Sequence, residues 1–124
     1  MSSDRANDAA QLRKHPRLEA VFPLAYSIEG DAAVNHGRSR DIGGGGISFD
    51  SSEPIAPNAE VTIWFELRPG LKISVSGRIV STSVDRAANT HRHRFRFTKI
   101  SENVRDSILT YIFESWRHSL LNQV

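Results

Sequence analysis

The chain has 124 residues, of which 39% are hydrophobic, and this length suits one folded domain. Its 16 basic and 14 acidic residues give a formal net charge of +2, which argues against a dedicated binder of nucleic-acid polymers and suits a small anionic ligand held by local charges. The sequence contains no cysteine, which excludes disulfides, thiol catalysis and cysteine-based metal sites. It shows no apolar run of membrane-spanning length and no signal-peptide pattern, so we expect a cytoplasmic protein without a membrane span.

The first third of the chain combines a polar segment with two expected strands. Residues 1–12 are polar and lack strand alternation, so we expect a flexible N-terminal arm ahead of a single domain at residues 13–120. Between residues 22 and 28 every second residue is large and apolar, which predicts a half-buried strand. Residues 34–42 predict a weaker strand, because charged residues interrupt its alternation.

Four further strands follow. A run of four glycines at residues 43–46 turns the chain into a short strand at 47–49. Residues 61–67 and 71–79 alternate strongly on both sides of a turn, which predicts a long hairpin with one buried and one wetter face. A last strand at residues 91–98 places histidines and phenylalanines on one side and arginines on the other.

From Ser101 onward the apolar period changes to that of a helix. The residues of the apolar stripe are Val104, Ile108, Ile112, Trp116 and Leu120, widened by Leu109 and Phe113. Ser101 is the expected N-cap of this helix. Six strands followed by one amphipathic helix predict an all-β fold, a six-stranded antiparallel barrel across which the C-terminal helix packs.

Two short motifs frame the first strands. Arg13 and Arg17 form Arg-x-x-x-Arg, and Asp41, Gly43 and Gly46 form Asp-x-Gly-x-x-Gly. A guanidinium is a planar fork of donors that fits a phosphate in a bidentate way, and 13 of the 16 basic residues are arginine. Glycines let the backbone approach a ligand closely and adopt positive φ. The pair of motifs therefore indicates an anion-binding site.

The order and spacing of the two motifs resemble those of PilZ domains, which carry Arg-x-x-x-Arg followed by Asp/Asn-x-Ser-x-x-Gly. The resemblance runs from residue 13 to about residue 116 and includes the strand Gly77-Arg78-Ile79-Val80 and the sequence Phe95-Arg96-Phe97. Two positions depart from the family pattern, because Gly43 replaces its serine and Arg94 stands where glycine is common.

The resemblance implies a receptor for the bacterial second messenger cyclic di-GMP that is not an enzyme and needs neither cofactor nor metal. The candidate ligand-binding residues are Arg13, Arg17, Asp41, Gly43 and Gly46, with Lys14 and Arg40 as further candidates. The arginines would grip phosphates and guanine, and the aspartate with its glycine turn would hold a guanine edge. Because Gly43 lacks the serine hydroxyl, we expect weakened binding. The arm would fold over the ligand and change the face offered to an unidentified downstream protein, and the receptor would be a monomer or a homodimer.

Other interpretations of the same residues remain open. His91 and His93 share one face of a strand and could ligate zinc, but no third ligand has recognisable spacing, which favours a structural or exposed pair. The aromatic and arginine residues of this strand alternate as in single-strand-binding barrels, although alternation also predicts phenylalanines in the core. Trp64, expected on an outward face, could contact a partner. A barrel that binds single-stranded nucleic acid, or a PilZ-fold interaction module that has lost its ligand, is the alternative.

Overall fold

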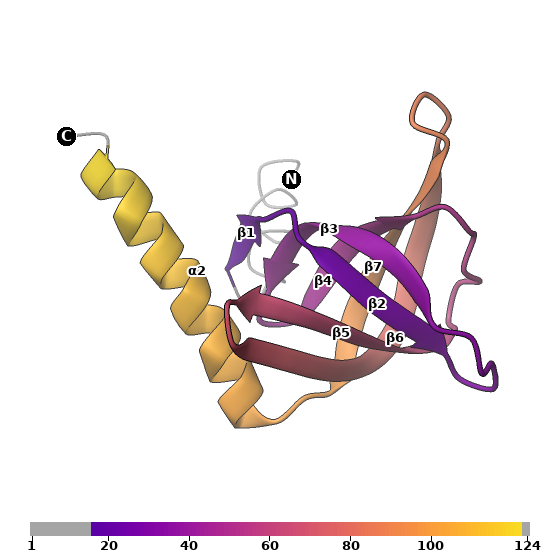
Figure 1. The fold of residues 1–124 in the computed structure, drawn as a ribbon, viewed down its shortest axis with the longest axis horizontal. Coiled ribbons are helices and arrows are strands. Elements are labelled where there is room, and N and C mark those ends of the chain that lie inside the picture. Colours follow the sequence, from indigo (N-terminus) through magenta and orange to yellow (C-terminus); the bar gives the residue numbers. More distant parts are fainter. Residues whose placement is uncertain (1–15, 123–124) are drawn as a thin grey trace, which may run out of the picture.

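The structure, a computed structural model, describes residues 16–122 and consists of seven strands followed by one long helix (Figure 1). The elements are β1 (Arg17–Glu19), β2 (Pro23–Ile28), β3 (Asn35–Gly43), β4 (Gly46–Ser51), β5 (Glu60–Arg68), β6 (Leu71–Asp85), β7 (Thr90–Lys99) and α2 (Glu102–Asn122). The expected arm, together with Arg13 and Lys14, lies outside the described residues.

Six of the strands close into an antiparallel barrel, as the sequence predicts. Neighbouring strands follow the order β3-β2-β5-β6-β7-β4, and β4 pairs back onto β3. The seventh strand, β1, was not predicted, since three residues are too few to show alternation. It continues along the edge of β3 beyond β2, with Arg17 opposite Gly43 and Glu19 opposite Asp41. Arg17, which lies ahead of the first strand expected from the sequence at residues 22–28, is therefore itself part of a strand.

The junction between β1 and β2 is fixed by one buried side chain. The hydroxyl of Ser39, which is fully buried in β3, donates to the carbonyl of Ala20 at 2.5 Å and accepts from the amide of Phe22 at 2.8 Å. A buried hydroxyl with two partners is a satisfied polar group. This contact fixes the chain that follows β1 and so helps to place Arg17 beside β3.

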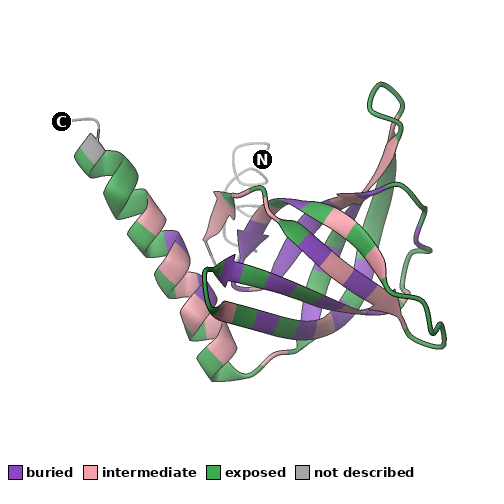
Figure 2. Ribbon diagram, in the orientation of Figure 1, coloured by how far each residue is buried: buried purple, intermediate pink, exposed green. Residues whose placement is uncertain are grey.

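Alternation places the apolar side chains inside the barrel, and buried segments alternate with less buried ones along the strands in Figure 2. The largest fully buried residues include Tyr26, Phe49 and Ile63, whereas Trp64 on the opposite face of β5 is 39% exposed, as expected. Phe95 and Phe97 also lie in the core. The strand pattern read from the sequence thus predicts which face of β5 and β7 is buried.

Helix α2 begins where the sequence predicts and covers one end of the barrel with its first half only. The hydroxyl of Ser101 accepts from the amide of Val104 at 3.2 Å, which is an N-cap. Ile108 and Ile112 are fully buried, but Leu120 is 64% exposed. In Figure 2 the buried segments of α2 lie in its first half. A 21-residue helix is about 30 Å long and extends past the barrel, so the expected stripe is not packed along its whole length. No helix within residues 16–122 is long and apolar enough to cross a lipid bilayer.

A bulge in β3 explains the irregular alternation of residues 34–42. In the pairing with β4, Ser39 lies opposite Phe49 and Asp41 lies opposite Ser48, so that Arg40 is one extra residue. Ser39 and Ile42 are buried, while Arg40 and Asp41 are both turned away from the core. A bulge re-aims side chains in this way. Two adjacent charged residues therefore face the same outer surface.

Candidate ligand-binding site

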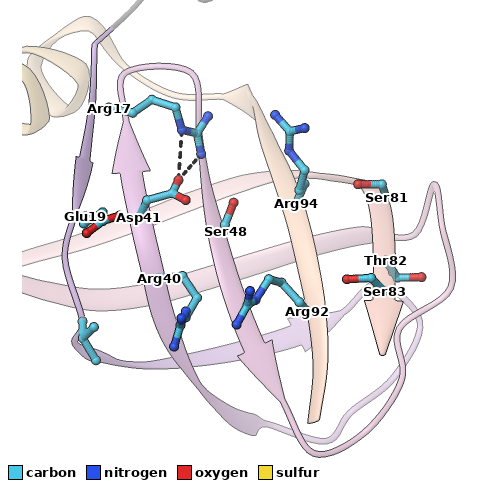
Figure 3. Close-up of a pocket in the computed structure, with 11 residues that line it drawn as sticks. Arg17, Glu19, Arg40, Asp41, Ser48, Ser81, Thr82, Ser83, Arg92 and Arg94 are labelled. Atoms are coloured by element: carbon cyan, nitrogen blue, oxygen red, sulfur yellow. Dashed lines mark hydrogen bonds and ion pairs between the residues drawn. The ribbon is translucent and has the colours of Figure 1, made fainter. Parts of the chain in front are cut away.

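A pocket of about 520 Å³ lies on the outer surface of the barrel, over β1, β3, β4, β6 and β7 (Figure 3). Its lining residues are Arg17, Glu19, Val21, Arg40, Asp41, Ser48, Ser81, Thr82, Ser83, Arg92 and Arg94. The lining contains four arginines and two carboxylates, and Asp50, which contacts Arg40 and Arg92 from outside the lining, reduces the excess to one positive charge. The volume is within the range of about 300–1,000 Å³ that is common for small-molecule sites.

Antiparallel register brings the pocket residues together from distant parts of the chain. One row across the sheet consists of Glu19, Asp41, Ser48, Arg94 and Ser81, each opposite the next on the neighbouring strand. In Figure 3, Arg17 and Arg94 lie toward one end of the pocket and Arg40 and Arg92 toward the other. This row forms the floor of the pocket, and guanidinium groups lie at both ends of the pocket.

Arg17 and Asp41 form an ion pair at one end of the pocket. The Nε of Arg17 donates to Oδ1 of Asp41 at 2.9 Å, and its Nη2 contacts the same oxygen. The two side chains are only 21% and 31% exposed, so solvent screens the pair incompletely. Two residues that the motifs assign to ligand binding therefore contact each other directly.

Asp50 organises the other end of the pocket. Its Oδ1 accepts from Nε of Arg92 at 2.9 Å, and its Oδ2 lies 3.8 Å from Nε of Arg40. The hydrogen bond from Arg92 to Asp50 raises the pKa of Arg92 above its usual value, against the opposing effect of burial. The side chains of Arg40 and Arg92 are thereby held at a shared carboxylate.

The glycines of the second motif allow neighbouring strands to approach each other closely. A Cβ at Gly43 would lie 2.8 Å from the carbonyl oxygen of Pro16, and a Cβ at Gly46 would lie 2.1 Å from that of Phe95. Among the described glycines, Gly30 (φ 86°) and one other turn glycine have positive φ, and both lie outside this run. The glycine run therefore does not depend on the ability of glycine to adopt positive φ. Neither Gly43 nor Gly46 lines the pocket.

The structure therefore brings together part of the sequence-predicted site. Arg17, Asp41 and the secondary candidate Arg40 line one pocket. Sequence reasoning missed Arg92 and Arg94, which it assigned to a water-facing strand surface. A signal existed in the three outward arginines of residues 91–98, but their relation to the motif depends on the pairing of β7 with β4.

Of the two histidines in β7, His93 has a structural role. This residue is fully buried, and its Nε2 lies 2.8 Å from the hydroxyl of Ser51, which itself donates to the carbonyl of Glu53 at 2.6 Å. The serine hydroxyl must then accept from Nε2–H, which leaves Nδ1 without a proton or a partner in the described part of the chain. Burial, followed by the nearby His91, lowers the pKa of His93. Residues 16–122 contain no cluster of three or more potential metal-ligating side chains.

Fold and pocket together define a class: a small antiparallel barrel with an arginine-rich pocket on its outer surface. The PilZ domain family matches residues 11–114, which is most of the chain. The chain belongs to the PilZ domain family, as its motifs indicate. A comparison with curated proteins found no match.

Several solved structures have the same fold, and they include a PilZ domain. The PilZ domain of YcgR from Escherichia coli with c-di-GMP has a TM-score of 0.70 and 18% identity, over 90% of this chain and 96% of that one. The Bacillus subtilis inhibitor of motility MotI/DgrA has a TM-score of 0.74 and 15% identity, over 86% of this chain. The MrkH–c-di-GMP complex from K. pneumonia has a TM-score of 0.64 and 12% identity, over 90% of this chain. This chain spans about half the length of the latter two, 52% and 53%.

Proposed function

We propose that this protein is a cytoplasmic receptor for cyclic di-GMP and not an enzyme. The observation that carries the proposal is the pocket in which Arg17 and Asp41, one residue from each PilZ motif, lie side by side. Solved PilZ proteins with this fold hold c-di-GMP, which supports the same ligand class. The excess of arginines over carboxylates in the pocket suits the phosphodiesters of the ligand.

Binding exchanges one set of charged hydrogen bonds for another. In the structure Arg17 donates to Asp41. In the complex Arg17 turns its donors toward a phosphodiester or toward O6 and N7 of guanine, and Asp41 accepts from N1–H and the exocyclic amine of guanine. Adenine lacks these two donors at the same edge, so Asp41 gives the site its preference for guanine. The exchange costs affinity, because the existing pair must be replaced.

The remaining motif residues complete the proposed site. Arg13 adds a second guanidinium from the N-terminal side, with Lys14 beside it, and Arg40 extends the positive surface at the far end. Gly43 and Gly46 contribute by keeping the strands close together. The ligand is the only small molecule that the proposal requires, without cofactor or metal.

Isothermal titration with cyclic di-GMP tests the proposal. We expect binding near micromolar Kd and much weaker binding of cyclic di-AMP. Arg17→Ala removes binding and, because the residue is ion-paired, lowers the free energy of unfolding by about 1 kcal/mol. Arg78→Ala is the matched control, since Arg78 pairs with Glu60 outside the pocket. Absence of detectable binding by the wild-type protein at about 100 μM ligand overturns the proposal.

We further propose that the signal leaves the domain through ligand-induced ordering of the N-terminal arm. Residues 1–12 are followed directly by Arg13, so a ligand held by this arginine and by Arg17 draws the arm toward the barrel. The downstream protein then meets a changed surface, on a monomer or a homodimer. Hydrogen exchange measures this directly: protection of residues 10–20 and 41–46 rises on saturation, and unchanged protection at residues 10–20 rules the arm out as the switch.

A protein-interaction module without a ligand is the second candidate function. The second half of α2 supports it, because Phe113, Trp116 and Leu120 are 54%, 38% and 64% exposed. Large exposed apolar groups that gather on one element mark interaction surfaces. The same titration separates the two candidates. Binding of single-stranded nucleic acid has less support, because Phe95 and Phe97 of β7 are buried and present no stacking surface.

A further inference from the structure

Arg94 differs from the other arginines of the pocket in its surroundings. Each of the other three lies within ion-pair distance of a carboxylate. Among residues 16–122, no carboxylate lies within that distance of the Arg94 guanidinium. Its neighbours across the strands are Ser48 and Ser81, whose short side chains leave the guanidinium exposed. Arg94 therefore offers an unneutralised fork of donors to an incoming anion.

The position of Arg94 suits a contact on the side of the ligand opposite Arg17. Arg94 is separated from Asp41 by one strand, β4, so the backbones at the two positions are about 10 Å apart, two strand spacings. Figure 3 shows the guanidinium groups of Arg17 and Arg94 at the same end of the pocket, with Ser48 between their strands. A ligand seated over Asp41 and Ser48 lies between two arginines.

We propose that Arg94 binds a phosphodiester of the ligand across the pocket from Arg17, although it belongs to neither sequence motif. The inference rests on the proposed function, because cyclic di-GMP supplies the phosphodiester. Arg94 needs no existing pair to be broken before it binds, unlike Arg17. A hydrogen bond from a charged donor is roughly twice as strong as one between neutral groups. Arg94 thereby offsets the serine hydroxyl that is missing at Gly43.

Titration of matched variants with cyclic di-GMP tests the inference. Arg94→Ala is expected to weaken binding about 10- to 100-fold, the loss of a charged hydrogen bond. Arg96→Ala is the control. Arg96 lies on the same face of the same strand and is exposed like Arg94, but it does not line the pocket. Its binding is expected to change less than about threefold. Because both arginines are exposed, thermal unfolding of both variants stays close to that of the wild type.

Arg94→Lys identifies the group that Arg94 contacts. A lysine retains a point charge for a phosphate but cannot reproduce a bidentate contact with guanine. Binding by Arg94→Lys that is clearly tighter than by Arg94→Ala supports the phosphodiester. Equal losses in these two variants overturn that assignment, and equal losses at positions 94 and 96 show a long-range charge effect instead. Unchanged binding by Arg94→Ala overturns the inference alone, whereas no binding by the wild type overturns the proposed function with it.

Discussion

Gly43 determines how closely β1 approaches β3, and substituting it tests both the packing and the site. A Cβ at this position would lie 2.8 Å from the carbonyl oxygen of Pro16 and 3.1 Å from Cγ of Arg17, whereas ordinary contacts are 3.4–4 Å. Relief requires β1 to move by more than half an ångström at a backbone atom. Overpacking of this kind costs about 1–3 kcal/mol. We therefore expect Gly43→Ala to lower the free energy of unfolding by that amount and to weaken cyclic di-GMP binding by displacing Arg17.

Gly43→Ser separates the steric effect from the missing hydroxyl. Serine introduces the same Cβ as alanine, so its stability is expected to match that of Gly43→Ala. If its hydroxyl also reaches the ligand, it restores up to about tenfold in affinity relative to alanine, the value of one neutral hydrogen bond of about 0.5–1.5 kcal/mol. Thermal unfolding and isothermal titration of both variants provide the comparison.

Gly46 provides a second glycine position with which the effect at Gly43 can be compared. A Cβ there would lie 2.1 Å from the carbonyl oxygen of Phe95, a much closer approach than at Gly43. Gly46→Ala is therefore expected to be more destabilising than Gly43→Ala. Wild-type stability of Gly43→Ala refutes the described packing of β1 against β3, and the reverse order of the two alanine variants refutes the argument from backbone approach.

Two further predictions concern the core. Burial lowers the pKa of His93, so the unfolded chain, with a histidine pKa near 6.5, binds more protons than the native state around and below that pH. The free energy of unfolding is therefore highest above this pH and falls as the pH drops through it. Chemical denaturation at pH 5.5–7.5 should show a weaker pH dependence in His93→Gln, and an unchanged dependence in this variant would contradict the burial of a neutral His93. Ile112→Ala should lower the free energy of unfolding by about 2–5 kcal/mol and Leu120→Ala by less than about 0.5 kcal/mol, since the first residue is fully buried and the second is 64% exposed; similar effects of the two would contradict the described packing of α2.

The regular elements of this fold could be predicted because their signals are local. Alternation at residues 61–67 and 71–79 places both strands of the hairpin, and the change of period after Ser101 marks the helix start within one residue. The three residues of β1 carry no period, and their pairing is visible only once β3 is in place. The exposure of the second half of α2 could not be predicted from local sequence either, because it depends on where the barrel ends.

Only the site residues that belong to the two motifs could be predicted from the sequence. Arg17 and Asp41 could be paired from the order and spacing of two motifs, and the structure places them in contact. Arg92 and Arg94 join them through the pairing of β4 with β7, more than 40 residues apart in the chain, which alternation alone does not reveal. The glycine run was recognised, but the reason for it is the approach of one backbone to another rather than positive φ.

The extra residue in β3 also determines where this strand can change its length. Ser39 and Ile42 face inward on either side of two outward residues, Arg40 and Asp41. Loss of either of these two outward residues would leave a regular two-residue repeat in which all the remaining side chains keep their direction. Loss of one residue elsewhere in the strand would instead turn an isoleucine toward solvent or a carboxylate toward the core. The bulge is thus the place at which β3 can be shortened while the barrel is kept, and loss of Arg40 there would leave a pocket with one arginine fewer.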